Sequence, residues 1–187
     1  MAREMLRQGG RSARIQAEVH RTVQDLLKTM DRSEITVPMI AERAGVTPST
    51  IYRRWGDLSE LLADVAVARM RPIADPDDTG ALASDMEAFV VQYAEEMSSR
   101  VGRAMLVDVV GSVQSGAAAQ CCQYTYHHLE TLRERAVARG ETPFDVEEAI
   151  DRVMAPIVYH ILFGDRELSP DYCRTLVRGF FAVSVYE

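Results

Sequence analysis

Between Thr47 and Trp55 the chain carries a run of side chains suited to hydrogen bonding with phosphates and base edges. An arginine can bridge two acceptors on a guanine or clamp a phosphate, and serine, threonine and tyrosine hydroxyls can donate to phosphate oxygens. No carboxylate lies between Ala44 and Gly56 to repel a phosphate. The residues that carry this chemistry are Pro48, Ser49, Tyr52 and Arg53.

The surrounding residues predict two short helices joined by a tight turn. Gly45 can adopt the left-handed backbone that ends a first helix. Thr47 is a good N-cap for a second helix, and Pro48 at its first position loses only an N–H that has no partner there. Ile51 and Trp55 are four residues apart and point inward, which leaves the polar residues on the opposite face. This helix-turn-helix pattern is typical of proteins that place a helix in the DNA major groove, although it also occurs as an ordinary corner in helical proteins.

The whole stretch resembles the DNA-binding domain of the tetracycline-repressor (TetR) family of transcription regulators. The matching residues are Thr36, Ile40, Ala41, Ala44, Gly45, Val46, Thr47, Thr50, Ile51, Tyr52, Trp55, Leu61 and Leu62. The resemblance implies that Pro48, Ser49, Tyr52 and Arg53 face base edges or the adjacent backbone. It implies phosphate contacts for Thr36, Thr50 and Arg54, and we include Thr47 in the expected DNA-binding set.

One position departs from the family pattern. The family usually has a lysine three residues after the aromatic at Trp55, whereas this chain has Leu58. The departure predicts that one phosphate contact is missing, which bears on affinity more than on the mode of binding.

The charge distribution supports a nucleic-acid partner for one end of the chain only. The net charge is −7, but residues 1–55 contain ten Lys or Arg against six Asp or Glu. The remaining residues, 56–187, contain eleven against twenty-two, so the basic part is the part with the motif. This asymmetry predicts an attractive field at one end. A non-specific or architectural DNA binder, the alternative, generally needs basic surface over much of the protein.

Composition is typical of a compact intracellular protein. The chain has 187 residues, 47% of them hydrophobic, which is sufficient for a real core. No apolar run approaches the roughly 18 residues of a membrane span, so we expect a cytoplasmic protein with no membrane partner. Three cysteines form no disulfide framework, and we expect no cofactor and no metal site.

Hydrophobic periodicity predicts an all-α fold of about nine helices and no strand. We expect a three-helix DNA-binding domain over residues 1–56 and an effector-binding and dimerisation domain over 57–187, with a linking helix at 57–70. Asp57 and Glu60 are interpreted as a capping pair at the start of that helix. Pro156 is expected to bend its helix. The remaining helices are expected near 11–31, 81–99, 101–112, 116–139, 145–163 and 169–185.

The last two of these helices carry apolar residues on more than one face, so each needs two partners. We expect them to pair with their symmetry mates in a homodimer, although a helix enclosed within its own domain would show the same pattern. A dimer would present two reading helices to double-stranded DNA and would select a palindromic operator.

The helices between 81 and 139 are rich in soft and amphipathic side chains, which suit a small, mostly apolar effector. The family resemblance implies such a pocket behind the linking helix, although most of these residues would serve the core equally well. The predicted function is a ligand-responsive regulator, most simply a repressor released by its effector. The candidate effector residues are Met86, Phe89, Tyr93, Met105, Tyr124 and His127.

Two other functions are open to the same residues. Cys121 and Cys122 with His127 and His128 predict a thiol- or metal-responsive regulator, but adjacent cysteines rarely ligate one ion together. An enzyme could use a Cys–His pair or neighbouring carboxylates such as Glu147 and Glu148. Consecutive helical positions diverge by about 100° per residue, so neither pair converges on a substrate atom, and we expect no catalysis.

Overall fold

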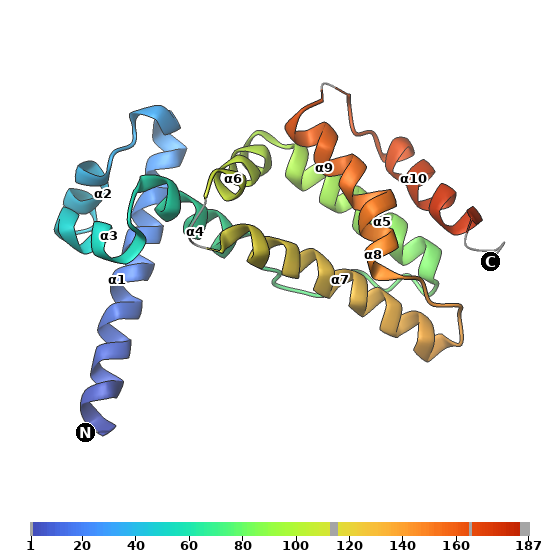
Figure 1. The fold of residues 1–187 in the computed structure, drawn as a ribbon, viewed down its shortest axis with the longest axis horizontal. Helices are drawn as coiled ribbons and strands as arrows, with labels where there is room; N and C mark the ends of the chain where they lie inside the picture. Colours follow the sequence, from blue (N-terminus) through green and yellow to red (C-terminus); the bar gives the residue numbers. More distant parts are fainter. Residues whose placement is uncertain (1, 113–115, 165, 184–187) are drawn as a thin grey trace. The chain divides into compact units, whose positions relative to one another are not determined.

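The computed structural model describes residues 2–112, 116–164 and 166–183, and over these residues the protein is all-helical (Figure 1). No strand occurs in the described ranges. A π-helical turn, Ile150–Met154, joins α8 and α9 into one continuous helix, so the prediction of about nine helices is confirmed. The turn ends two residues before Pro156, which has no N–H to donate to a preceding carbonyl.

The helices begin and end close to the predicted positions, with one exception. The first helix was expected from about residue 11, but α1 begins at Ala2, because the residues before the apolar repeat include good helix formers that periodicity alone does not detect. The first elements are α1 (Ala2–Thr29), a 3₁₀ turn η1 (Arg32–Glu34), α2 (Val37–Arg43), α3 (Pro48–Trp55) and α4 (Leu58–Met70). The later ones are α5 (Leu82–Ser98), α6 (Arg100–Gly111), α7 (Ala117–Arg139), α8 (Val146–Ala149), α9 (Ala155–Leu162) and α10 (Pro170–Val183).

The chain forms two compact units, which we call the head and the body. The head comprises Met1–Arg69 with Asp108–Ala117, and the body comprises Met70–Val107 with Ala118–Glu187. The linking helix α4 therefore packs almost entirely with the head, beyond the boundary expected at residue 56, and α6 contributes its last residues to the same unit.

The core of the head is formed by the apolar helix faces that the sequence pattern predicts. The helices α1 to α4 each contribute to it, and its buried residues expose at most 9% of their surface. The core residues with no exposed surface are Val19, Val23, Leu26, Ile40, Ile51 and Leu61. The partly exposed Leu58 packs against this cluster, so the residue that replaces the family lysine contributes to the head's apolar packing.

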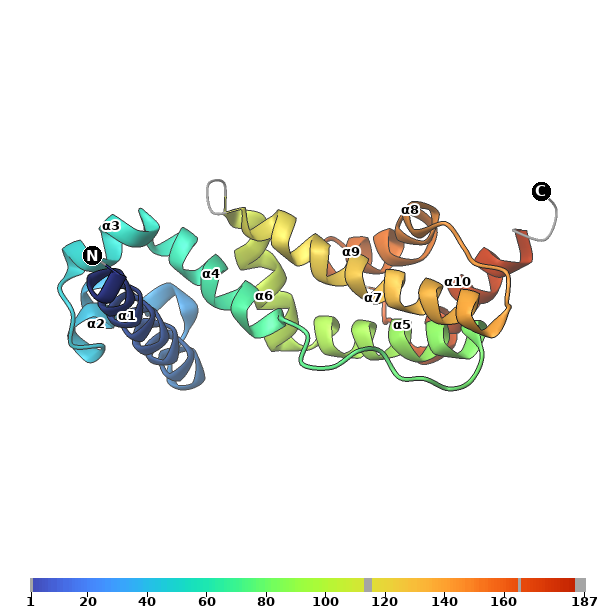
Figure 2. The ribbon, with the colours of Figure 1, turned by 90° about the horizontal axis from the view of Figure 1, so that it is seen from below.

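The body is a helical bundle in which α10 lies against α5 (Figure 2). Cys173, Val177 and Phe180 on α10 are buried against this core, and Phe180 makes an edge-on ring contact with Phe144. These contacts cover one face of α10 with apolar surface from the same chain.

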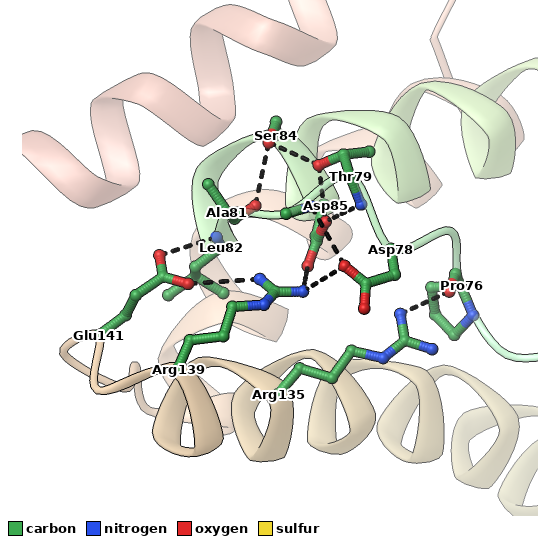
Figure 3. A network of polar contacts seen from close by, with 11 residues as sticks. Pro76, Asp78, Thr79, Ala81, Leu82, Ser84, Asp85, Arg135, Arg139 and Glu141 are labelled. Carbon is green, nitrogen blue, oxygen red and sulfur yellow. Dashed lines mark hydrogen bonds and ion pairs between the residues drawn. The ribbon is translucent and has the colours of Figure 1, made fainter.

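A polar network fastens the segment before α5 to the end of α7 (Figure 3). The fully buried carboxylate of Asp85 accepts hydrogen bonds of 2.6 Å from both the backbone N–H and the hydroxyl of Thr79, and one of 2.8 Å from Arg139. Arg139 also pairs with Asp78, and Glu141 accepts a hydrogen bond from the backbone N–H of Leu82. Burial acts to raise the pKa of Asp85, but these donors hold it below its ordinary value.

Candidate nucleic-acid interface

The turn between α2 and α3 has the geometry that its sequence predicts. Gly45 adopts a left-handed conformation with φ of 65°, and the N–H of Val46 donates to the carbonyl of Ala41 at 2.9 Å. This six-residue closure satisfies the last carbonyls of α2 and turns the chain toward α3. Pro48 occupies the first turn of α3, as expected.

Thr47 takes the backbone conformation of an N-cap but does not cap α3 with its side chain. Its hydroxyl instead lies 2.9 Å from that of Ser49 and 3.0 Å from that of Thr50. Thr47 is therefore the N-cap residue, as predicted, but its side chain makes no capping hydrogen bond because it contacts the neighbouring hydroxyls instead. The result is a group of three hydroxyls at the start of α3.

The predicted separation of an inner and an outer face along α3 is confirmed. Ile51 is fully buried and Trp55 nearly so. Tyr52 retains half of its surface, and Arg53 is exposed, as are Pro48 and Ser49. The exposed face therefore presents a phenol, a hydroxyl and a guanidinium, and contact of these groups with DNA stays a prediction.

Arg54 and Thr36, two of the expected phosphate contacts, already have partners in the head. Arg54 donates to the hydroxyl of Ser12 at 2.7 Å and to the side-chain oxygen of Gln16 at 2.5 Å, which ties α3 to α1. Its guanidinium also lies 5.2 Å from the Trp55 ring centroid. Thr36 caps α2, since its hydroxyl accepts a 3.4 Å hydrogen bond from the N–H of Met39.

Asp64 is a structural residue of the head that sequence reasoning missed. Its Oδ2 accepts a 2.7 Å hydrogen bond from the indole N–H of Trp55 and lies 2.8 Å from Nε2 of His20. Burial acts to raise the pKa of Asp64, but the hydrogen bonds from His20, Trp55 and Gln16 hold it below its ordinary value. Its position between the apolar residues Leu62 and Val65 could have indicated from the sequence that this carboxylate is partly buried and needs a partner.

The end of α6 is joined to the rest of the head by polar contacts. Asp108 is buried and pairs with Arg32 of η1. The hydroxyl of Ser112 donates to the carboxylate of Glu60 at 2.6 Å. The expected capping pair is thus only half present, because Asp57 caps α4 through the N–H of Glu60 while the Glu60 side chain binds Ser112.

The candidate effector residues divide into three environments in the body. Met86 and Phe89 are buried in the core, whereas Tyr93, Met105 and Tyr124 are half-buried. The His127 side chain is 67% exposed, with Nε2 4.0 Å from a carboxylate oxygen of Asp75. Its neighbour His128, which the effector set omitted, is half-buried and makes an edge-on contact with Phe89 at 5.3 Å between centroids.

The cysteines do not assemble a metal or thiolate centre. Burial raises the pKa of Cys121 to about 11, so its thiol stays protonated at neutral pH. Cys122 is exposed, and Cys173 is buried in the core of the body. Across residues 2–112, 116–164 and 166–183, no three His, Cys, Asp or Glu residues gather in a geometry able to hold a metal ion. Within the same ranges no helix has both the length and the apolar character to cross a membrane.

Comparison with known proteins identifies the family. The model of the tetracyclin repressor-like C-terminal domain matches residues 76–179, and that of the bacterial regulatory proteins of the tetR family matches residues 32–65. The uncharacterized HTH-type transcriptional regulator YdeS of Bacillus subtilis (strain 168) is 27% identical over 165 residues, which cover 84% of this chain and 83% of YdeS. The HTH-type transcriptional regulator AqdR of Rhodococcus erythropolis is 26% identical over 112 residues, which cover 60% of this chain and 54% of AqdR.

A solved structure shows the same fold. The crystal structure of a TetR transcriptional regulator from Agrobacterium tumefaciens superposes with a TM-score of 0.62 and 19% identity, covering 90% of this chain and 93% of that one. The helix-turn-helix geometry, the helical body and the two matched domain models lead to one conclusion. The chain belongs to the TetR family of DNA-binding transcriptional regulators.

Proposed function

We propose that this protein binds a palindromic operator as a homodimer, represses transcription there, and is released by a small, largely apolar effector. The observation that carries the proposal is the exposed outer face of α3, on which Ser49, Tyr52 and Arg53 project from a helix whose inner face is buried. We assign Arg53 and Tyr52 to base edges or the adjacent backbone. We assign Ser49 to the same surface, and the hydroxyl of Thr50 to a phosphate oxygen, to which a hydroxyl can donate.

An unpartnered apolar face supports the dimer. On α9, Ile157 and Ile161 are buried in the body, but Tyr159 and Phe163 are 59% and 74% exposed. These two exposed rings are four residues apart, with centroids 5.7 Å from each other. An α9 face of this kind is suited to pack against its symmetry mate.

The outward face of α10 is suited to the same interface. Thr175, Gly179 and Ala182 are exposed, and a Cβ added at Gly179 would meet no other atom. Small residues at helical spacing allow a second helix to approach closely. We therefore propose that α9 and α10 pair with their counterparts in a four-helix interface, as the sequence pattern predicts.

Dimerisation is tested by light scattering on the wild-type protein and on a Phe163→Glu variant. We expect twice the chain mass for the wild type at micromolar concentration, and a shift toward one chain mass for the variant. Phe144→Glu is unsuitable as a control because Phe144 is buried, so Val137→Glu, at an exposed position of α7, serves instead. A wild-type mass equal to one chain would refute the dimer.

Operator recognition is tested by selecting preferred sequences from a random duplex library and titrating the result against random DNA. Two reading helices related by a two-fold axis predict an inverted repeat with half-sites about 34–36 Å apart or a multiple of that. Specific binding predicts a large preference for the repeat. Equal affinities with a steep salt dependence would instead indicate binding to phosphates alone.

Effector release requires that the ligand bind the free and operator-bound forms unequally. We propose that α6 couples effector binding to the DNA-binding head, because this helix begins in the body and ends in the head. The contacts of Asp108 with Arg32 and of Ser112 with Glu60, both within the head, support this role. An effector affinity that is the same with and without operator would rule out this mechanism. The protonated Cys121 gives the thiol- or metal-responsive alternative less support.

A further inference from the structure

The first turns of α1 extend beyond the apolar core of the head (Figure 1). The helix begins at Ala2, whereas Ile15 is the first side chain in its described part that packs against that core. The residues from Gly10 to Arg14 are all exposed. This part of α1 therefore presents a surface and does not contribute to core packing.

Two arginines on this surface have no partner in the protein. Arg11 and Arg14 are exposed, and neither forms an ion pair or a hydrogen bond with any residue in the described part of the chain. In the sequence, Arg3 and Arg7 precede them at intervals of four residues, a spacing that brings positions to the same face of a helix. Arg11 and Arg14 therefore carry positive charge that no described carboxylate neutralises.

The cations further along α1 differ from these two because each has an acidic partner. Arg21 pairs with Glu18 at 2.6 Å, and Lys28 pairs with Asp25 at 2.9 Å. Both pairs join residues three positions apart on α1. Within the described part of this helix, the unneutralised positive charge thus lies before Ile15.

Hydrogen bonds from α3 fix where this segment lies in the head. Ser12, which stands between the two arginines in the sequence, accepts hydrogen bonds from Arg54 through its hydroxyl at 2.7 Å and its backbone carbonyl at 3.2 Å. One turn later, the side-chain oxygen of Gln16 accepts a third, of 2.5 Å, from the same guanidinium. Arg11 and Arg14 therefore belong to the part of α1 that is tied to the last turn of α3.

We infer that Arg11 and Arg14 bind phosphates of the DNA backbone beside the base pairs that α3 contacts. The inference rests on the proposed function, since it adds a second element to the same DNA complex. An exposed guanidinium without a carboxylate partner can replace the counterions of a phosphate without first losing an ion pair. Contacts of this kind add to affinity for every DNA sequence and carry no base information.

The test measures how salt affects DNA binding by the full-length protein, as wild type and as the double variant Arg11→Ala/Arg14→Ala. Loss of two phosphate contacts should reduce the slope of log binding constant against log salt concentration by about two per protomer. Binding at roughly 0.1 M salt should weaken by about tenfold or more, on the selected operator and on random duplex alike. A slope unchanged from the wild type would overturn the inference.

A matched double variant controls for the change in net charge. Arg21→Ala/Lys28→Ala removes two cations from the same helix, but these are already paired, so the slope should change much less. Arg11→Lys/Arg14→Lys keeps both charges and should keep a slope close to that of the wild type, because an ammonium also binds phosphate. An equal loss of slope for the two alanine pairs would indicate a long-range effect of net charge and would overturn the inference.

Two further measurements separate this inference from its alternatives. Urea denaturation should show the same stability for Arg11→Ala/Arg14→Ala and the wild type, because neither arginine touches the core. A lower light-scattering mass for this variant with an unchanged slope would instead assign the arginines to contact between copies of the chain.

The same titrations distinguish failure of the inference from failure of the proposed function. If the wild type prefers a palindrome but the double variant keeps the wild-type slope, only the phosphate contacts are wrong. If the wild type shows no preference among DNA sequences, operator recognition fails. A reduced slope on random duplex would in that case still support phosphate binding by Arg11 and Arg14.

Discussion

Arg32 and Asp108, separated by 76 positions in the sequence, form a hydrogen-bonded ion pair that holds the end of α6 to the head. Nε of Arg32 donates to Oδ1 of Asp108 at 2.5 Å, and the carboxylate is buried while the guanidinium is half-exposed. Burial raises the pKa of Asp108, and Arg32 opposes this rise. Within the head, the pair therefore links the last turn of α6 to the 3₁₀ turn that precedes the helix-turn-helix motif.

Removing Arg32 is therefore expected to destabilise the head. Arg32→Ala leaves a buried carboxylate without its cation, which should lower the free energy of unfolding by about 1–3 kcal/mol. Asp108→Asn removes the charge but keeps a hydrogen-bonding group, and it should cost less. Urea denaturation measures both, with Arg21→Ala on the exposed surface of α1 as the control. A larger loss for Asp108→Asn than for Arg32→Ala would contradict this account.

The two arginines at the end of α3 are expected to behave differently. Arg53→Ala should cost about 1–3 kcal/mol of operator binding if Arg53 reads a guanine, with little loss on random DNA. Arg54→Ala should weaken binding to cognate and random DNA by similar amounts. It should also lower the stability of the head, because Arg54 ties α3 to α1 through Ser12 and Gln16. Parallel titrations on cognate and random duplexes make the comparison. Equal losses on both duplexes for Arg53→Ala would exclude a reading role.

Leu58→Lys tests whether the start of α4 lies near the DNA backbone. Lysine restores the cation of the family pattern, and its long stem can keep part of the apolar packing of Leu58. We expect the variant to bind all DNA more tightly than the wild type. The plot of log binding constant against log salt concentration should become steeper by about one unit. Leu58→Met, which adds no charge, is the matched control. An affinity unchanged from the wild type would place this helix start away from the phosphates.

Asp85 is expected to contribute to acid sensitivity. Its pKa is lower in the folded protein than in the unfolded chain, so the folded state holds this proton less tightly. The stability that this difference supplies is present above the unfolded pKa and is lost as the pH falls through the folded pKa. Asp85→Asn should flatten the fall in unfolding free energy below about pH 4. Denaturation curves between pH 3 and 7 (roughly the range set by the carboxyl pKa) check this, and an unchanged slope would contradict it.

Gly102 is expected to tolerate no side chain. A Cβ at this position would overlap the carbonyl oxygen of Glu96 and the Cα of Met97, both backbone atoms of α5 that cannot move independently. Gly102→Ala should therefore destabilise the body by about 1–3 kcal/mol, despite the higher helix propensity of alanine. Gly10→Ala, at an exposed position of α1 where the added Cβ meets no atom, is the control. Thermal denaturation of both variants would reveal the difference, and equal midpoints would refute the predicted overlap.

The sequence alone determined the local elements of the motif and the outer face of α3. Gly45, Pro48 and the spacing of Ile51 and Trp55 act within one or two helical turns, so their effect on the backbone can be read without knowing the rest of the fold. The same local logic located most helices of the body.

Only the tertiary structure decided which charged residues form pairs and which of the two adjacent histidines packs against a neighbouring helix. Asp64, Glu60 and Asp108 find partners in segments far away in the sequence, and long-range pairings of this kind leave no periodic signal. His127 and His128 are equivalent by composition, but adjacent helical residues point about 100° apart. The packing of α7 against α5 turns His128 toward Phe89 and leaves His127 exposed, because only one of two such neighbours can face the partner helix.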